Sequence, residues 1–65
     1  MRYEIRVDGQ MSDTLIAAFP ELESFLVQHQ TVLFGPVVDE AQLYGLLSRL
    51  QALGLRVAEM RRLPE

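Results

Sequence analysis

The sequence predicts a small α+β domain, and three of its features carry that prediction. Polar and apolar residues alternate strictly over residues 2–8, which is typical of a β-strand with one wet face. Leucines recur at helical spacing within residues 38–55. Between these stretches, residues 24–28 and 31–37 are rich in β-branched and aromatic side chains and are separated by a polar turn, which predicts a hairpin. The length of 65 residues indicates a single domain over residues 1–65.

The first predicted strand is followed by a short helix. After a turn, Ser12 is placed to cap a helix over residues 13–19. Pro20 ends this helix, because the residue before a proline disfavours the helical conformation. The predicted hairpin comes next.

The long helix has a start signal. Asp39 is placed as its N-cap, accepting a hydrogen bond from the amide of Gln42, while the Gln42 side chain reaches back to the amide of Asp39. Val38 and Leu43 are spaced to touch as a hydrophobic staple. These residues predict where the helix begins and the angle at which the preceding strand enters it.

The end of the long helix is specified as well. Gly54 is able to take the left-handed conformation that stops a helix, and Leu55 is placed to fold back on Leu50. Between the two ends, a leucine stripe roughly 120° wide predicts one buried face. The stripe comprises Leu43, Leu46, Leu47, Leu50 and Leu53.

The last predicted strand covers residues 55–63 and has an imperfect pattern. Val57 and Ala58 both point inward only if the strand is bulged there. If this strand lies beside the first, opposite charges pair across the two strands and fix their register. The pairs are Glu4 with Arg61 and Arg6 with Glu59, and Ile5 then aligns with Met60.

The predicted order of elements is strand, helix, strand, strand, helix, strand. In a compact ferredoxin-like βαββαβ fold, both helices pack on one face of a four-stranded antiparallel sheet. We therefore expect this fold, with one short and one long helix on that face.

Much of the chain resembles a known family. The matching residues are Tyr3-Glu4-Ile5-Arg6-Val7, Gly35-Pro36-Val37-Val38-Asp39, Leu43-Tyr44-Gly45-Leu46-Leu47, Arg49-Leu50, Leu53-Gly54-Leu55 and Arg61-Arg62. Together they are similar to a family of short uncharacterised proteins from GC-rich bacterial genomes. Because these residues are caps, core and turns, the resemblance implies the fold and assigns no site.

Composition narrows the classes of function. The chain has no cysteine, one histidine and a formal net charge of −3. Acidic residues near His29 do not supply a recognisable metal spacing, and nucleic-acid binding, which depends on clustered cations, is disfavoured. No apolar run is long enough to span a membrane, and charges interrupt any signal peptide. We therefore expect a cytoplasmic protein without cofactor, metal or membrane association.

A chain this short buries only about 60% of its unfolded surface, and its thin core favours self-association. Our first hypothesis is a non-enzymatic protein-interaction module, homodimeric, with another protein as its partner. Two surfaces are candidate interfaces: a strip of small residues on the back of the long helix, and the open face of the sheet. The strip comprises Ala41, Gly45, Ser48 and Ala52, and we expect Leu33 and Val57 on the open face together with Leu26, away from Val32 and Phe34.

The presence of Gly45 inside a helix needs an explanation, because glycine there lowers stability by about 0.5–1 kcal/mol relative to alanine. We expect Gly45 to be packed, either against the short helix of residues 13–19 or against a helix across a dimer interface. An ordinary exposed face is the remaining alternative.

The other candidate sites can each be interpreted either as functional or as purely structural. Arg56, Arg61 and Arg62 form the densest positive cluster, which is either a patch for an acidic partner or a set of cross-strand ion pairs. His29 is expected at an exposed hairpin tip, and no residue is assigned a catalytic role. The alternative function is a ligand-sensing regulatory domain that holds a small effector between the loop of residues 8–13 and a neighbouring subunit.

Overall fold

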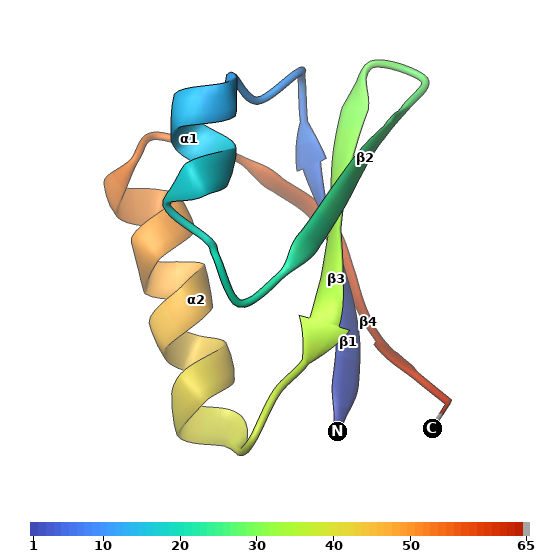
Figure 1. The fold of residues 1–65 in the computed structure, drawn as a ribbon, viewed down its shortest axis with the longest axis vertical. Helices are drawn as coiled ribbons and strands as arrows, with labels where there is room; N and C mark the ends of the chain where they lie inside the picture. The colour runs from blue at the N-terminus through green and yellow to red at the C-terminus, as the bar shows by residue number, and fades with distance from the viewer. Residues whose placement is uncertain (65) are drawn as a thin grey trace.

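The computed structural model describes residues 1–64, which fold into six elements in the predicted order. These elements are β1 (Arg2–Asp8), α1 (Asp13–Ala17), β2 (Glu23–Val27), β3 (Gln30–Pro36), α2 (Glu40–Ala52) and β4 (Val57–Leu63). The strands form one antiparallel sheet in the order β2-β3-β1-β4, and both helices lie on the same face (Figure 1). The predicted compact ferredoxin-like α+β arrangement is confirmed.

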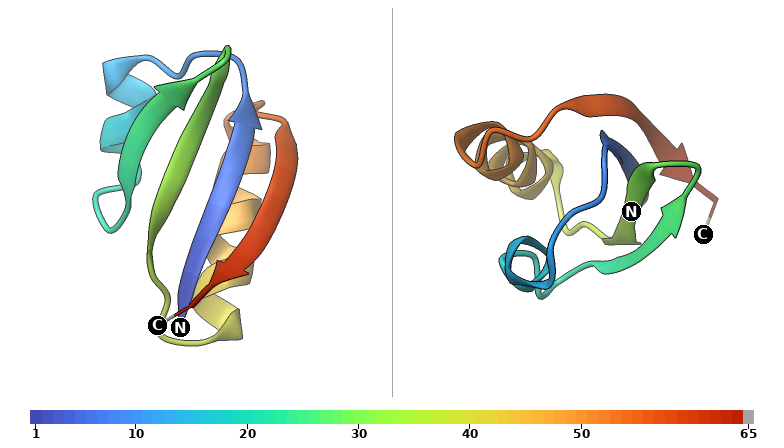
Figure 2. Two further views of the ribbon diagram at one scale, coloured as in Figure 1. Left: turned by 90° about the vertical axis from the view of Figure 1, so that its right-hand side faces the viewer. Right: turned by 90° about the horizontal axis from the view of Figure 1, so that it is seen from above.

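The helices and the sheet make two layers. Figure 2 shows α2 behind the β1 and β4 half of the sheet and α1 beside β2, while the other face of the sheet carries no helix. Apolar side chains from both layers meet between them. The buried cluster comprises Ile5, Val7, Met11, Phe19, Leu33, Val37, Leu43, Leu46 and Leu50.

The start of α2 is close to the predicted one but differs in detail. The Oδ1 atom of Asp39 accepts a hydrogen bond from the N–H of Gln42 at 2.9 Å. The Oε1 atom of Gln42 accepts from the N–H of Val38 at 2.6 Å, one residue before the predicted partner. The predicted staple is wrong, because Val38 is 85% exposed while Val37 is buried. Successive side chains of an extended segment point to opposite sides, so burying Val37 turns Val38 outward.

The end of α2 is the predicted one. Gly54 is left-handed with φ of +76°, and its N–H donates to the carbonyl oxygen of Gln51 at 3.0 Å. The N–H of Leu55 donates to the carbonyl oxygen of Leu50 at 3.0 Å. These two bonds make the Schellman motif, which satisfies carbonyls that the helix leaves without partners.

The predicted pairing of β1 with β4 is confirmed residue by residue. Glu4 lies opposite Arg61, and Arg6 lies opposite Glu59. The register then shifts so that Val7 faces Val57, with Ala58 as the additional residue. The strand is therefore bulged at the place where the sequence pattern required it.

The prediction of which β3 residues face the helices is wrong. Leu33 lies opposite Ile5 and is 1% exposed, so it belongs to the core and not to the open face. Val32 and Phe34 lie opposite Arg6 and Glu4 and therefore occupy the open face. A continuous apolar run has no alternation that distinguishes its two sides, and a choice offset by one residue exchanges every side chain between the faces.

Candidate functional site

The free edge of β4 is the longest unpaired edge in the described structure. This strand ends the sheet order, and its residues up to Arg62 are all exposed. Met60 and Val57 lie opposite Ile5 and Val7 on the helix side of the sheet and remain 39% and 37% exposed. The prediction that placed Val57 on the open face is therefore wrong, because the bulge at Ala58 shifts the register. Large apolar side chains therefore lie beside a row of backbone groups that no other strand of residues 1–64 pairs.

The hydrogen-bonding direction of β4 follows from that of β1. The N–H of Asp8 donates to the carbonyl oxygen of Arg56 at 2.9 Å, on the β4 side. Backbone groups of successive residues in a strand point to alternate sides, so those of Arg6 and Glu4 also point towards β4. Glu59 and Arg61, which lie opposite Arg6 and Glu4, therefore direct their own backbone N–H and C=O groups towards β1. The backbone groups of Met60 and Arg62 consequently point outwards from the sheet, whereas the bulge at Ala58 interrupts the alternation.

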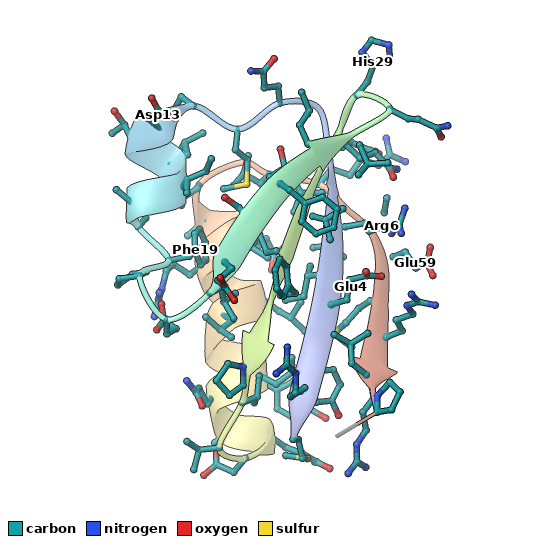
Figure 3. The ribbon with its side chains drawn as sticks, turned by 45° about the vertical axis from the view of Figure 1, so that its right-hand side comes forward. Glu4, Arg6, Asp13, Phe19, His29 and Glu59 are labelled. Atoms are coloured by element: carbon teal, nitrogen blue, oxygen red, sulfur yellow. The ribbon has the colours of Figure 1, made fainter. Side chains whose placement is uncertain are left out.

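An ion-pair network covers the open face of β1 and β4. Glu4 accepts from the Nε of Arg61 at 2.9 Å and from the Nε of Arg6 at 3.4 Å. The Glu4 side chain is only 10% exposed, whereas that of Arg61 is 58% exposed. Figure 3 shows Glu4, Arg6 and Glu59 near one another on this side of the sheet. Positive and negative charges therefore alternate both along and across these strands.

The three candidate patch arginines do not share one face. Arg61 pairs with Glu4, and Arg62 lies opposite Tyr3, which places it on the other side of the strand. Arg56 lies 3.8 Å from Asp8 with its side chain 87% exposed. Arg61 and Arg62 thus lie on opposite faces of β4, and Arg56 forms an ion pair just before the strand begins.

The small-residue strip on α2 lies in water. Ala41, Gly45, Ser48 and Ala52 are all exposed. A Cβ built on Gly45 would meet no described atom within 4 Å. The predicted packing of Gly45 against the short helix is therefore wrong, because α1 contacts α2 on a different side.

That contact is made by Arg49, for which the sequence pattern predicts no role. Its Nη1 atom donates to the carbonyl oxygen of Ala18 at 2.9 Å and to the Oε1 of Glu21 at 3.1 Å. Its guanidinium carbon lies 5.2 Å from the centre of the Phe19 ring. The backbone amide of Glu21 and then the Arg49 guanidinium lower the pKa of the Glu21 carboxyl from its ordinary 4.5. Arg49 therefore holds the end of α1 against α2.

A second apolar region lies on the open face near β2. The rings of Phe25 and Phe34 meet edge to face with centres 5.4 Å apart, and Phe25 is 47% exposed. Leu26, placed by prediction on the open face, lies opposite Thr31 on the helix side and is 54% exposed at the sheet edge.

The loop after β1 is held by Thr31. The N–H of Met11 donates to the Thr31 Oγ1 at 2.9 Å, and that hydroxyl donates to the carbonyl oxygen of Gly9 at 2.9 Å. Met11 is 4% exposed. The candidate effector loop is therefore tied to β3 by two hydrogen bonds and one buried side chain.

The remaining candidate residues have structural positions and form no site among the described residues. The Oγ of Ser12 accepts from the N–H of Leu15 at 3.2 Å as the cap of α1. His29 lies at the exposed hairpin tip (Figure 3). Within residues 1–64 no pocket is found, and no three potential metal-ligating side chains gather. No helix in this part of the chain is long and apolar enough to cross a bilayer.

Comparison with known proteins identifies a family. No match is found among curated proteins or among solved structures. One family model, described as a domain of unknown function, matches residues 2–61 and thus nearly the whole chain. The chain therefore belongs to the DUF8691 family.

Proposed function

We propose that this domain is a non-enzymatic protein-interaction module that self-associates. One observation carries the proposal: both edge strands of the sheet expose large apolar side chains beside unpaired backbone. These side chains are Phe25 and Leu26 on β2 and Val57 and Met60 on β4. An exposed sheet edge is a template for pairing with another chain, and apolar exposure next to it adds area to bury.

Small size supports the same conclusion. A domain of 65 residues has limited core, and association adds buried area that the isolated chain lacks. The buried apolar cluster already uses most of the large aliphatic side chains of α2 and β3. Further burial is therefore available at the edges of the sheet.

We also propose a bacterial and cytoplasmic setting for this module. All six basic residues are arginine, which is consistent with a GC-rich genome. The absence of cysteine in the sequence is compatible with a reducing compartment.

The test is the molar mass in solution from micromolar to millimolar concentration, measured by light scattering during chromatography. We expect twice the chain mass, with a dissociation constant within this range. A single-chain mass throughout would refute self-association. Thermal denaturation with a metabolite library provides a second test, because a ligand at about 100 times its dissociation constant stabilises by ~2.7 kcal/mol. A reproducible rise in melting temperature with one class of metabolite would favour the ligand-sensing alternative.

A further inference from the structure

We propose that the partner of the β4 edge is the β4 edge of a second copy of this chain, paired antiparallel about Met60. This inference rests on the proposed self-association and specifies its surface. Two antiparallel copies centred on Met60 place Glu59 of each opposite Arg61 of the other. The same register brings Arg62 to Ala58, the additional residue of the bulge, so the regular pairing runs from Glu59 to Arg61 in each copy.

The charge pattern selects this register. A pairing centred on Glu59 places two glutamates opposite each other, and one centred on Arg61 places two arginines opposite each other. Only the centre at Met60 turns the charges of the open face into two attractive cross-strand pairs. Charges on an edge strand usually prevent pairing, but these charges are complementary to their own copy.

The ion pairs within each chain continue the alternation of charge across the proposed interface. Glu4 already binds Arg61, and Arg6 lies opposite Glu59. In the paired dimer, a row of alternating charges runs from Glu4 through Arg61 to Glu59 and Arg6 of the second copy. Each inner charge then has an opposite charge on both sides.

The backbone direction and the apolar side chain of Met60 are also consistent with pairing centred on this residue. The backbone groups of Met60 point outwards from the sheet, so the two copies of Met60 form a hydrogen-bonded pair. At such a centre, the flanking Glu59 and Arg61 occupy the closer, non-hydrogen-bonded positions. Met60, which is 39% exposed, meets its copy on the helix side of a continuous sheet.

The experiment uses charge reversal with a complementing mixture, read by sedimentation velocity on the full chain. Glu59→Arg and Arg61→Glu each place like charges opposite each other in their own homodimer. We expect each variant alone to dimerise about tenfold to a hundredfold more weakly than the unmodified chain. Mixed in equal amounts, the two variants restore both attractive pairs, and we expect a heterodimer close to the original affinity.

Each reversal also disturbs its own chain, since Arg6 faces position 59 and Glu4 faces position 61. Circular dichroism tests whether both variants remain folded, and a folding defect in either variant would not be reversed by mixing the two. Glu23→Arg, the same charge reversal on the other edge strand, is the matched control and should leave dimerisation unchanged.

The outcomes separate the two proposals. If the unmodified chain is monomeric throughout, self-association itself is refuted. If the chain dimerises and both reversals dimerise equally well, the β4 interface is refuted while self-association stands. A mixture no more dimeric than its components, or a loss in Glu23→Arg equal to that in Glu59→Arg, also overturns pairing about Met60.

Discussion

The two faces of the sheet bury side chains by different means. On the helix side, Ile5 and Leu33 are each 1% exposed beneath a layer of helices. None of the described helices covers the other face, yet Val32 is 0% exposed and Glu4 only 8%. Val32 lies between Arg6 and Phe25 on its neighbouring strands. Long side chains lying across the strands therefore cover the centre of the open face.

This difference locates the surface that remains for a partner. The centre of the open face is already covered by arginine stems and aromatic rings, so a partner gains little by covering it again. Among the residues of the sheet, the exposed large apolar side chains instead lie on the two edge strands, while Val38, Tyr44 and Leu53 are exposed on α2 and at its ends. Four sets of substitutions examine this contrast between covered and uncovered surfaces.

The largest effect is expected from truncation on the helix side. Leu33→Ala removes a fully buried side chain and should lower the free energy of unfolding by about 2–5 kcal/mol. Val32→Ala, equally buried on the open face, should cost about 1–2 kcal/mol, because fewer methyl groups are lost and flexible neighbours can collapse into the space. Urea denaturation measures both. An equal loss in the two variants would mean that the open face is packed as rigidly as the core.

The next effect concerns the buried carboxylate. Glu4→Arg removes the acceptor of two arginine contacts and should cost about 1–3 kcal/mol. Adding Arg61→Glu should recover about 0.2–1 kcal/mol, because an opposite pair is restored across the strands while Arg6 remains unfavourably placed. A double-mutant cycle by chemical denaturation measures the recovery. Additive losses would show that the ion pair contributes nothing to the open face.

A gain in stability is expected on the outer side of α2. Gly45→Ala adds a methyl group where no described atom lies within 4 Å, so the helix should gain about 0.4–1 kcal/mol. Gly54→Ala is the control, because its φ of +76° disfavours alanine and should make that variant less stable. Melting temperature and molar mass are measured together. Loss of both stability and dimer in Gly45→Ala would place the strip against a partner helix.

The smallest effect concerns the contact between the two helices at low pH. The pKa of Glu21 is lowered in the folded chain, so its carboxylate stabilises the fold above the ordinary value of 4.5 and loses this contribution as the pH falls below it. Glu21→Gln should therefore cost a few tenths of a kcal/mol at neutral pH, typical of an exposed pair, and nothing at acidic pH. Urea midpoints at pH values on both sides of 4.5 test this. A constant difference would exclude the ionised carboxylate as the cause.

Local signals explain which parts of the fold the sequence predicted correctly. The cap at Asp39 and the stop at Gly54 depend on residues within one turn, so their chemistry is readable along the chain. The pairing of β1 with β4 was predictable despite its distance in sequence. Charge complementarity at Glu4 and Arg61 distinguishes the correct register from its neighbours.

The errors arise where no local pattern decides. The run through Leu33 is apolar on both sides, so tertiary packing and not alternation determines which side is covered. The role of Arg49 depends on Ala18 and Glu21, far away in sequence, and a single arginine on a helix gives no sign of them. The exposure of Gly45 was missed for the opposite reason, since small size suggested a contact that the fold does not make.

The backbone of the hairpin tip predicts which part of this domain opens first. Gln28 and His29 both have left-handed backbones, with φ of 48° and 67°, in a turn where glycine or asparagine is preferred. Each raises the energy of the closed turn by roughly 1–2 kcal/mol, and β2 beyond it has only one neighbouring strand. Amide protons of β2 should therefore exchange with solvent through local opening, while those of β1, held between two strands, exchange only on global unfolding. Both β2 and β4 are edge strands, but only β2 adjoins the strained turn, so we expect the β2 margin to open first.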